Sequence, residues 1–501
     1  MPIRADNRRV TLAGPHADAV ELAARRWERG ACFQNPDRTR TFICGGAPMH
    51  FQSGGEWQEI DNRWQPGVAP WNYQMTACGY QVFALSRFDA GRIVRLEKAG
   101  HYVTYQPMAL NWSNDLDQIQ QIAMPMQVQG AVTATGADSL CQGGELRWSG
   151  AYGAGLDFTY TPSTHFFQKI LSIESLAKIG TPQPYIVSGG SPVLQLNFVF
   201  ASDLDLWIDG AKWDASTRRD TASIVEFRDA AGVRHWWWTV PYATDAKGEH
   251  VNGMLRVKKQ GASFYVSVLV PHAWLAGAEY PVRVDPDTYY AAAADGDIWG
   301  GGVGIDYATA RSTSVNNTAG QSFCSAGQNR RYSGGYYYNV YRYLLRFDTS
   351  GVEGNVGQAN LYLKASNDYS TADFDIAISK CTWTPTIPDN QEADYDAALA
   401  ADVDVVWRNT LGMAINTYYA SPNLDVTRII TDGYSYFAIL SAEDKNNSQP
   451  GGSEYISFYS SNNVDANKPY LSVTVAPPGS LLMLTPNKCG NKNFRMRGGK
   501  Q

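Results

Sequence analysis

The chain has 501 residues, a formal net charge of −6 at pH 7 and 44% hydrophobic residues. This globular composition excludes an intrinsically disordered protein. The mild negative charge argues against the broad basic surface of a nucleic-acid-binding protein and against a polybasic membrane anchor. Aromatic residues are enriched, with 29 Tyr, 15 Trp and 18 Phe, which is typical of sheets, protein interfaces and sugar-contacting surfaces.

The beginning of the chain and its cysteines indicate where the protein is made. MPIRADNRRV contains no apolar core segment, so we expect no secretory signal, and no apolar run is long enough to span a membrane. The seven cysteines have no CxxC pair; they are Cys32, Cys44, Cys78, Cys141, Cys324, Cys381 and Cys489. This pattern predicts mostly reduced, partly buried thiols and a protein made and assembled inside a cell, with use outside the cell after lysis left open.

One helix is predicted near the N-terminus. The segment 15–28, PHADAVELAARRWE, is rich in helix formers, with Val20 and Trp27 on one stripe and Gly30 as a stop signal. The helix could pack on the first domain, or it could make residues 1–30 a docking arm with Trp27 as its contact residue.

From about residue 31 onward, the pattern changes to short alternating runs separated by Gly, Asp, Asn and Pro. Their spacing is typical of β-sandwiches and barrels rather than of a parallel α/β sheet. Residues 193–210, VLQLNFVFASDLDLWIDG, predict a half-buried antiparallel strand or hairpin, and residues 392–401 predict a second short helix. We therefore expect an all-β protein of tandem β-sandwich or jelly-roll-like domains with a short N-terminal helix and extended termini, at least about 35% strand and under about 12% helix.

Composition changes near 285–295 and at 476–478 mark two of the boundaries between five expected parts of the chain. The expected parts are a helical arm (1–30), a β-rich domain (31–185), a β-rich domain closing at YPVRVDP (186–287), a β-sandwich (288–475) and a basic C-terminal arm (476–501). The C-terminal arm is either disordered or docked on a partner. Its predicted docking residues are Leu481, Leu482, Leu484, Arg495 and Arg497.

The segments 54–64 and 234–287 carry a first resemblance. RHWWWTVPYATDAKGEH, followed by FYVSVLVPHAWLAGAEYPVRVDPD, resembles the β-rich segment that precedes sandwich domains in many secreted and phage proteins, including RHS-type shells. GGEWQEIDNRW resembles the hairpin found near the start of such chains.

The block 288–475 carries a second resemblance, to a DNRLRE-type β-sandwich module. DGDIWG resembles its opening, YRYLLRFDTSGVEG and GQANLYLKAS resemble two successive strands, and EYISFYSSNN and KPYLSVTV resemble the closing strands. The chain departs from this pattern at 332–341 and 381–420. DNRLRE-type modules are similar to carbohydrate-binding modules, so the resemblance implies a sandwich with a structural or sugar-binding role.

No catalytic, metal or cofactor site is predicted. The chain has no GxSxG elbow, no HExxH motif and no Cys/His cluster. Structural, hydrogen-bonded roles are expected for His50, His165, His235 and His272. Asp203, Asp205 and Asp209 resemble a calcium loop only in composition, since EF-hand spacing is absent, and Glu56, Glu59 and Asp61 have the spacing of any exposed hairpin.

Clustered aromatics leave a sugar-binding interpretation open. Flat exposed rings can stack on sugar rings, although alternate tyrosines of a strand also form ordinary core. The predicted ligand-binding residues are Trp299, Tyr336, Tyr337, Tyr338 and Tyr341.

The sequence thus favours a structural, non-enzymatic component of a bacteriophage particle: a head-decoration, collar or tail-fibre protein that displays a β-sandwich for host-surface or glycan attachment. Its expected location is the virion. The expected partners are other virion proteins, further copies of the chain in a homo-oligomer and a host-surface glycan, with no nucleic acid and no membrane. The alternatives are a carbohydrate-binding module of a cell-surface protein and a polysaccharide-degrading enzyme.

Overall fold

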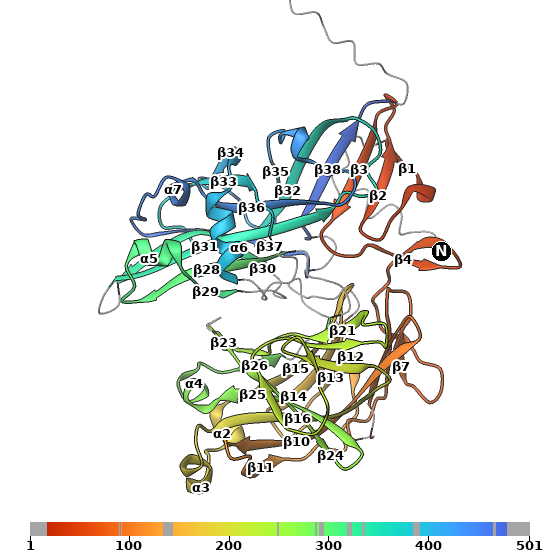
Figure 1. Cartoon of the computed structure of the whole chain (residues 1–501), viewed down its shortest axis with the longest axis vertical. Coiled ribbons are helices and arrows are strands. Elements are labelled where there is room, and N and C mark those ends of the chain that lie inside the picture. Colours follow the sequence, from red (N-terminus) through yellow and green to blue (C-terminus); the bar gives the residue numbers. More distant parts are fainter. Residues whose placement is uncertain are drawn as a thin grey trace, which may run out of the picture.

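The computed structural model describes residues 18–89, 91, 93–133, 144–247, 250–285, 288–289, 295–317, 323–332, 336–383, 391–463 and 467–477. Strands make up about 52% and helices about 10% of these residues, which confirms the all-β prediction. The ribbon forms two lobes stacked along the long axis of the molecule (Figure 1).

The N-terminal lobe is built from two antiparallel sheets. The first contains β6 (Gln65–Pro66), β7 (Tyr73–Met75), β8 (Gln81–Ala84), β9 (Val94–Lys98), β10 (His101–Ser113), β11 (Ile119–Ala123), β16 (Val193–Ser202), β19 (Arg219–Thr221), β24 (Met254–Gln260) and β25 (Ser263–Pro271). The second contains β12 (Ala131–Thr133), β13 (Glu145–Trp148), β14 (Leu156–Pro162), β15 (Phe166–Ile173), β17 (Asp205–Ile208), β18 (Ala211–Lys212), β20 (Val225–Arg228), β21 (Arg234–Trp238), β22 (Tyr242–Thr244), β23 (His250–Asn252), β26 (Val282–Asp285) and β27 (Thr288–Tyr289). Three short helices accompany them: α2 (Leu176–Ile179), α3 (Pro184–Ser188) and α4 (His272–Gly277).

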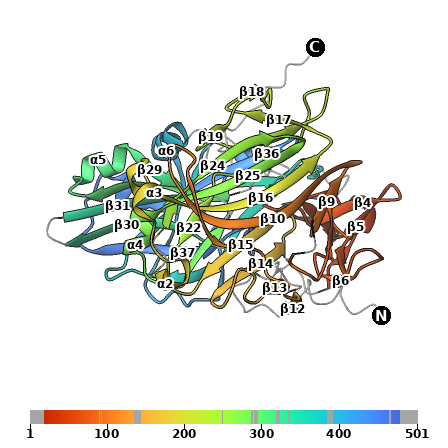
Figure 2. The ribbon, with the colours of Figure 1, turned by 90° about the horizontal axis from the view of Figure 1, so that it is seen from below.

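The segment 193–210 connects these two sheets. β16 lies between β10 and β25 in the first sheet, as Figure 2 shows, whereas β17 belongs to the second, so the strand prediction is confirmed and the hairpin alternative is wrong. Phe198 and Phe200 point into the core between the sheets, as the alternation predicts. The polar face is also buried. Its two amides are hydrogen-bonded through Oγ of Ser267, which accepts from Gln195 and donates to Asn197.

The predicted boundary at 185/186 does not separate the sheets. β16 pairs with β10, and β26 pairs with β15, so strands from both sides of this position share each sheet. One continuous hydrophobic core runs from Ile60 to Val284. Strands on the two sides of the boundary thus bury their apolar faces in the same core.

The C-terminal lobe is built on a sheet with strand order β1-β2-β3-β38-β32-β37-β30-β31-β36-β33-β34. Its strands are β1 (Val20–Glu21), β2 (Gly30–Gln34), β3 (Arg40–Gly45), β28 (Asp295–Val303), β29 (Ser314–Asn317), β30 (Phe323–Tyr332), β31 (Tyr336–Asp348), β32 (Val356–Asp368), β33 (Asp375–Lys380), β34 (Val403–Asn409), β35 (Tyr418–Ala420), β36 (Tyr434–Ser441), β37 (Ser453–Tyr459) and β38 (Tyr470–Val475). Its helical elements are η1 (Ala23–Arg25), α5 (Tyr307–Ser312), α6 (Gln391–Ala400), η2 (Val426–Arg428) and α7 (Ala442–Lys445). α6 confirms the helix predicted at 392–401.

β31 is the strand that folds this sheet into two layers. Its first half pairs with β30 and its second half with β36. Phe347 points into the core that these layers enclose, whereas Leu344 points into a second core formed with α5 and α6. Both faces of this strand are therefore buried.

The N-terminal helix prediction is wrong for residues 18–28. Val20 and Glu21 pair with β2, and η1 is a single 3-10 turn. Strand pairing prevails over helix propensity here because β2 and β3 extend the C-terminal lobe: β3 pairs with β38, so red and blue strands lie side by side in Figure 1. Residues 30–45 consequently belong to the C-terminal lobe's sheet.

The two lobes meet through buried polar side chains. Nε2 of His165 lies 2.6 Å from Oδ1 of Asn462, and Nζ of Lys468 donates to Oγ1 of Thr164 at 3.2 Å. The hairpin of β4 (His50–Ser53) and β5 (Glu56–Glu59) lies beside this junction (Figure 1).

Candidate functional site

An aromatic row crosses the C-terminal lobe where the sequence predicts ligand contact. Trp299 in β28 pairs with Tyr341 in β31, Tyr341 pairs with Gly327 in β30, and Gly327 pairs with Tyr455 in β37. Because directly paired residues point to the same face of a sheet, the register brings these positions into one line. Tyr369, which follows β32, continues the line beyond Tyr455. We call Trp299, Tyr341, Tyr455 and Tyr369 the aromatic row.

The rings of the aromatic row are in contact from one end to the other. Ring centroids lie 6.1 Å apart for Trp299 and Tyr341, 5.0 Å for Tyr341 and Tyr455, and 4.8 Å for Tyr455 and Tyr369. The close approach of β37 to β30 at this point requires glycine, since a Cβ on Gly327 (φ +124°) would lie 2.2 Å from the carbonyl oxygen of Glu454. Tyr369 is the most accessible ring, at 43% exposed.

A polar row runs beside the aromatic row, one pair of residues further along the strands. Asn339 pairs with Asn329, which pairs with Ser453. Asn339 donates to the hydroxyls of Tyr341 (2.9 Å) and Tyr337 (3.3 Å). Within the described residues, Oδ1 of Asn339 and Nδ2 of Asn329 are buried without a hydrogen-bond partner. Asn329 is 0% and Asn339 is 5% exposed, so these amides lie below the surface and can hold the tyrosines in place but cannot be reached from solvent.

The remaining predicted ligand residues divide between the two faces of β31. Tyr337 lies on the same face as Tyr341 and is half-buried. The prediction for Tyr338 is wrong: alternation turns this residue to the opposite face, where it is buried and packs against Tyr307 of α5. The side chain of Tyr336 lies outside the described part of the chain.

The docking prediction for Trp27 is wrong. Its ring is 8% exposed, Nε1 donates to the carbonyl oxygen of Asp348, and the ring packs against Phe42 in the core of the C-terminal lobe. Gly30 and Gly351 flank it, and a Cβ on either glycine would clash with the indole. The indole therefore attaches β2 to the C-terminal lobe and is not available to contact a partner protein. The other predicted docking residues, Leu481, Leu482, Leu484, Arg495 and Arg497, lie outside the described residues.

A second cluster lies at one edge of the N-terminal lobe. Nδ1 of His101 is 2.8 Å from Oδ2 of Asp203, and Nε2 of His235 is 3.0 Å from Oδ2 of Asp229. The two imidazole rings are 4.3 Å apart. One nitrogen of each histidine and one oxygen of Asp229 lie within 4.8 Å of one another, so these three residues could hold a metal ion. We call His101, Asp203, Asp229 and His235 the histidine–aspartate cluster.

The carboxylates of this cluster are held in their charged form. The pKa of Asp229 is lowered, chiefly by its hydrogen bond to His235. The pKa of Asp203 is also lowered: burial opposes its ionisation, but hydrogen bonds from the Tyr102 backbone and from His101 outweigh burial. Sequence patterns did not indicate the cluster because His101 and His235 are far apart along the chain. The D-x-x-x-x-x-H spacing of Asp229 and His235 across a hairpin was its one local signal.

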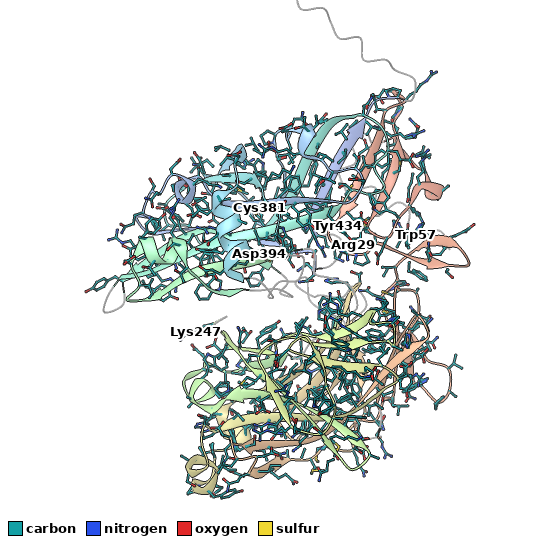
Figure 3. All side chains as sticks on the ribbon, in the orientation of Figure 1. Arg29, Trp57, Lys247, Cys381, Asp394 and Tyr434 are labelled. Carbon is teal, nitrogen blue, oxygen red and sulfur yellow. The ribbon has the colours of Figure 1, made fainter. Side chains whose placement is uncertain are left out.

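The other acidic residues considered in the sequence do not converge. Asp205 pairs with Lys212 and Asp209 accepts from Thr221, so the calcium-loop composition builds no common site with Asp203. Glu59 lies on the hairpin that carries Trp57 (Figure 3) and forms an ion pair with Arg26. Asp61 forms an ion pair with Arg63.

The thiol prediction is confirmed for the five cysteines that the structure describes. Cys32, Cys44, Cys78, Cys324 and Cys381 are free and buried. Burial raises the pKa of Cys32 to about 11 and that of Cys381 to about 12, the latter beside Asp394 (Figure 3). The neutral thiol therefore predominates at both positions at physiological pH.

Among the described residues, no helix has the length and apolar character needed to cross a bilayer. No protein-family model matches the chain, and a search of curated proteins gives no significant match.

Proposed function

We propose that the chain is a structural, non-enzymatic component of a bacteriophage particle and that its C-terminal lobe contacts a glycan through the aromatic row. The observation that carries the glycan contact is the exposed ring of Tyr369, which stacks at 4.8 Å on Tyr455 at the end of the aromatic row. The particle role rests on the resemblance of the sequence to RHS-type and DNRLRE-type segments.

The geometry of the aromatic row suits a sugar chain better than a small apolar ligand. Tyr455, which is 9% exposed, stacks between Tyr341 and Tyr369, so the ring of Tyr369, at 43% exposed, is the one on which a sugar face can pack. Burial raises the pKa of Tyr341, so its hydroxyl stays protonated and can donate or accept hydrogen bonds at physiological pH. A carbohydrate-binding module of a cell-surface protein would use the same face, and the two roles differ in where the protein is found.

Binding to a panel of immobilised bacterial surface polysaccharides tests the glycan contact. Wild-type protein should bind at least one of them, and Tyr369→Ala should weaken that binding about 2- to 12-fold, since an aromatic contact contributes about 0.5–1.5 kcal/mol. Tyr332→Ala is the matched control, because Tyr332 is 75% exposed but lies outside the aromatic row. Equal binding by Tyr369→Ala and the control would refute the role of the row, as would a wild-type protein that binds no member of the panel.

A further inference from the structure

We propose that the histidine–aspartate cluster is a binding site for a divalent transition-metal ion, with zinc as the best fit, and that the ion ties together the two sheets of the N-terminal lobe. The ligands are one imidazole nitrogen each from His101 and His235 and the carboxylate of Asp229. Asp203 is a positioning residue. This inference is independent of the proposed glycan contact.

The ligand chemistry fits zinc. Two imidazoles and one carboxylate are a known zinc donor set, and a water molecule can complete a tetrahedral shell. Zinc–ligand bonds of about 2.0–2.2 Å place neighbouring donor atoms about 3.3 Å apart. Nε2 of His235 and Oδ2 of Asp229 are 3.0 Å apart, and all three donor atoms lie within 4.8 Å of one another. Side-chain movements on the order of 1 Å would bring the donor atoms to the separation that zinc requires.

Asp203 prepares His101 for a metal. Its Oδ2 lies 2.8 Å from Nδ1 of His101, and its Oδ1 accepts from the backbone N–H of Tyr102 at 2.9 Å. When Nδ1–H donates a hydrogen bond to this carboxylate, the lone pair lies on Nε2, the arrangement in which carboxylates orient metal-binding histidines.

The cluster joins parts of the lobe that are otherwise connected through the core. His101 begins β10 in the first sheet, whereas His235 lies in β21 and Asp229 follows β20 in the second sheet. Side-chain exposures between 12% and 35% leave the four side chains accessible to an ion from solvent. A metal ion here would link the two sheets. It would stabilise the folded lobe, because it binds the folded lobe and not the unfolded chain.

Calorimetric titration of EDTA-treated, full-length protein with zinc chloride at pH 7.5 tests the proposal. Wild-type protein should bind one zinc ion at this site, and zinc should raise its melting temperature. His101→Ala and His235→Ala should each weaken binding about 100-fold or more and abolish the thermal shift, and Asp203→Asn should weaken binding about 10–100-fold by releasing the His101 ring.

The control variant is His272→Ala, which removes a half-buried histidine that packs on Trp112 outside the cluster and should bind zinc as the wild type does. Cobalt(II) added to wild-type protein should give the visible absorption of a tetrahedral site, a readout that needs no variant to fold. If the cluster forms only two separate ion pairs, the wild-type protein will bind no zinc and will give no cobalt spectrum, and the proposal is then wrong. Zinc binding that survives equally in His101→Ala and His235→Ala would also overturn the proposal.

Discussion

The two lobes reach similar all-β architectures by different routes along the chain. The core of the N-terminal lobe comes from one continuous stretch, Ile60 to Val284, whereas the C-terminal lobe combines residues before Gly45 with residues after Asp295. The N-terminal lobe is thus inserted between β3 and β28 of the C-terminal lobe. Only the N-terminal lobe is therefore formed by a contiguous segment of the sequence.

The lobes also differ in how they bury charge. In the C-terminal lobe, Arg342 and Asp444 form an ion pair at 2.8 Å, and both side chains are at most 1% exposed. In the N-terminal lobe, Arg256 is 2% exposed, but its partners Asp220 and Asp117 are 23% and 31% exposed. Water can therefore compensate for a lost partner in the N-terminal lobe much better than in the C-terminal lobe.

Separate expression of the two lobes should reveal the largest difference in stability between them. We predict that residues 60–289 melt cooperatively when expressed alone, whereas residues 288–477 do not, because the latter leave β38 without β3 and the core without Phe42. Thermal melts by circular dichroism provide the measurement.

A circular permutant supplies the control for these fragments. Joining residues 18–48 behind residue 477 through a Gly/Ser linker should restore a cooperative melt, because β2 and β3 can then pair as they do in the full chain. A cooperative melt of 288–477 without these strands would show that the C-terminal lobe is complete without them.

Trp27→Ala should affect one lobe only. Truncating this buried indole should lower the free energy of unfolding of the C-terminal lobe by about 3–5 kcal/mol, as measured by urea denaturation. Val20→Ala, at a position 56% exposed, should change it by less than about 0.5 kcal/mol. An unchanged stability for Trp27→Ala would revive the reading of this residue as a docking contact.

Loss of a buried carboxylate should also destabilise the two lobes to different extents. Asp444→Asn should destabilise the C-terminal lobe by about 3 kcal/mol, because the Arg342 guanidinium then stays buried without its carboxylate. Asp220→Asn should cost only about 1 kcal/mol, because Arg256 retains Asp117 and solvent reaches the site. Urea denaturation of both variants would measure the difference, and equal losses would contradict the contrast between the lobes.

His165, at the junction of the two lobes, should make the free energy of unfolding depend on pH. Burial, followed by the nearby charges of Lys468 and Arg29, lowers the pKa of His165 well below its usual value. Below about pH 6.5 the unfolded chain binds a proton that native His165 does not, so stability should fall with pH by at most about 1.4 kcal/mol per unit until the pH reaches the folded pKa.

The variant His165→Gln isolates this contribution. Its stability should fall less between pH 7.5 and pH 5 than that of the wild type, because glutamine does not titrate. Urea denaturation at the two pH values measures the difference. An identical fall in both proteins would show that His165 does not couple the junction to pH.

Local patterns predicted the strands well and their partners poorly. The alternation along 193–200 correctly placed Phe198 and Phe200 in the core, since period-two patterns report on strand faces, but it did not predict that the polar face of this strand is buried as well. Residues 15–28 misled because helix propensity is weak compared with the pairing of β1–β3 on β38, a contact across more than 400 residues. No local signal carries such a pairing.

The candidate sites show the same limit. Trp299 and Tyr341 were predicted, but Tyr455 and Tyr369 joined them only through the register across Gly327. The histidine–aspartate cluster depends on two sheets meeting at one edge, so spacing along the chain could not reveal it.

Quantitative mass spectrometry of gradient-purified phage particles tests the central claim most directly. The account predicts peptides from both lobes at a copy number comparable to that of other structural proteins, and their retention after repeated purification. Abundant peptides in the lysate that disappear from the purified particles would contradict a structural role in the virion.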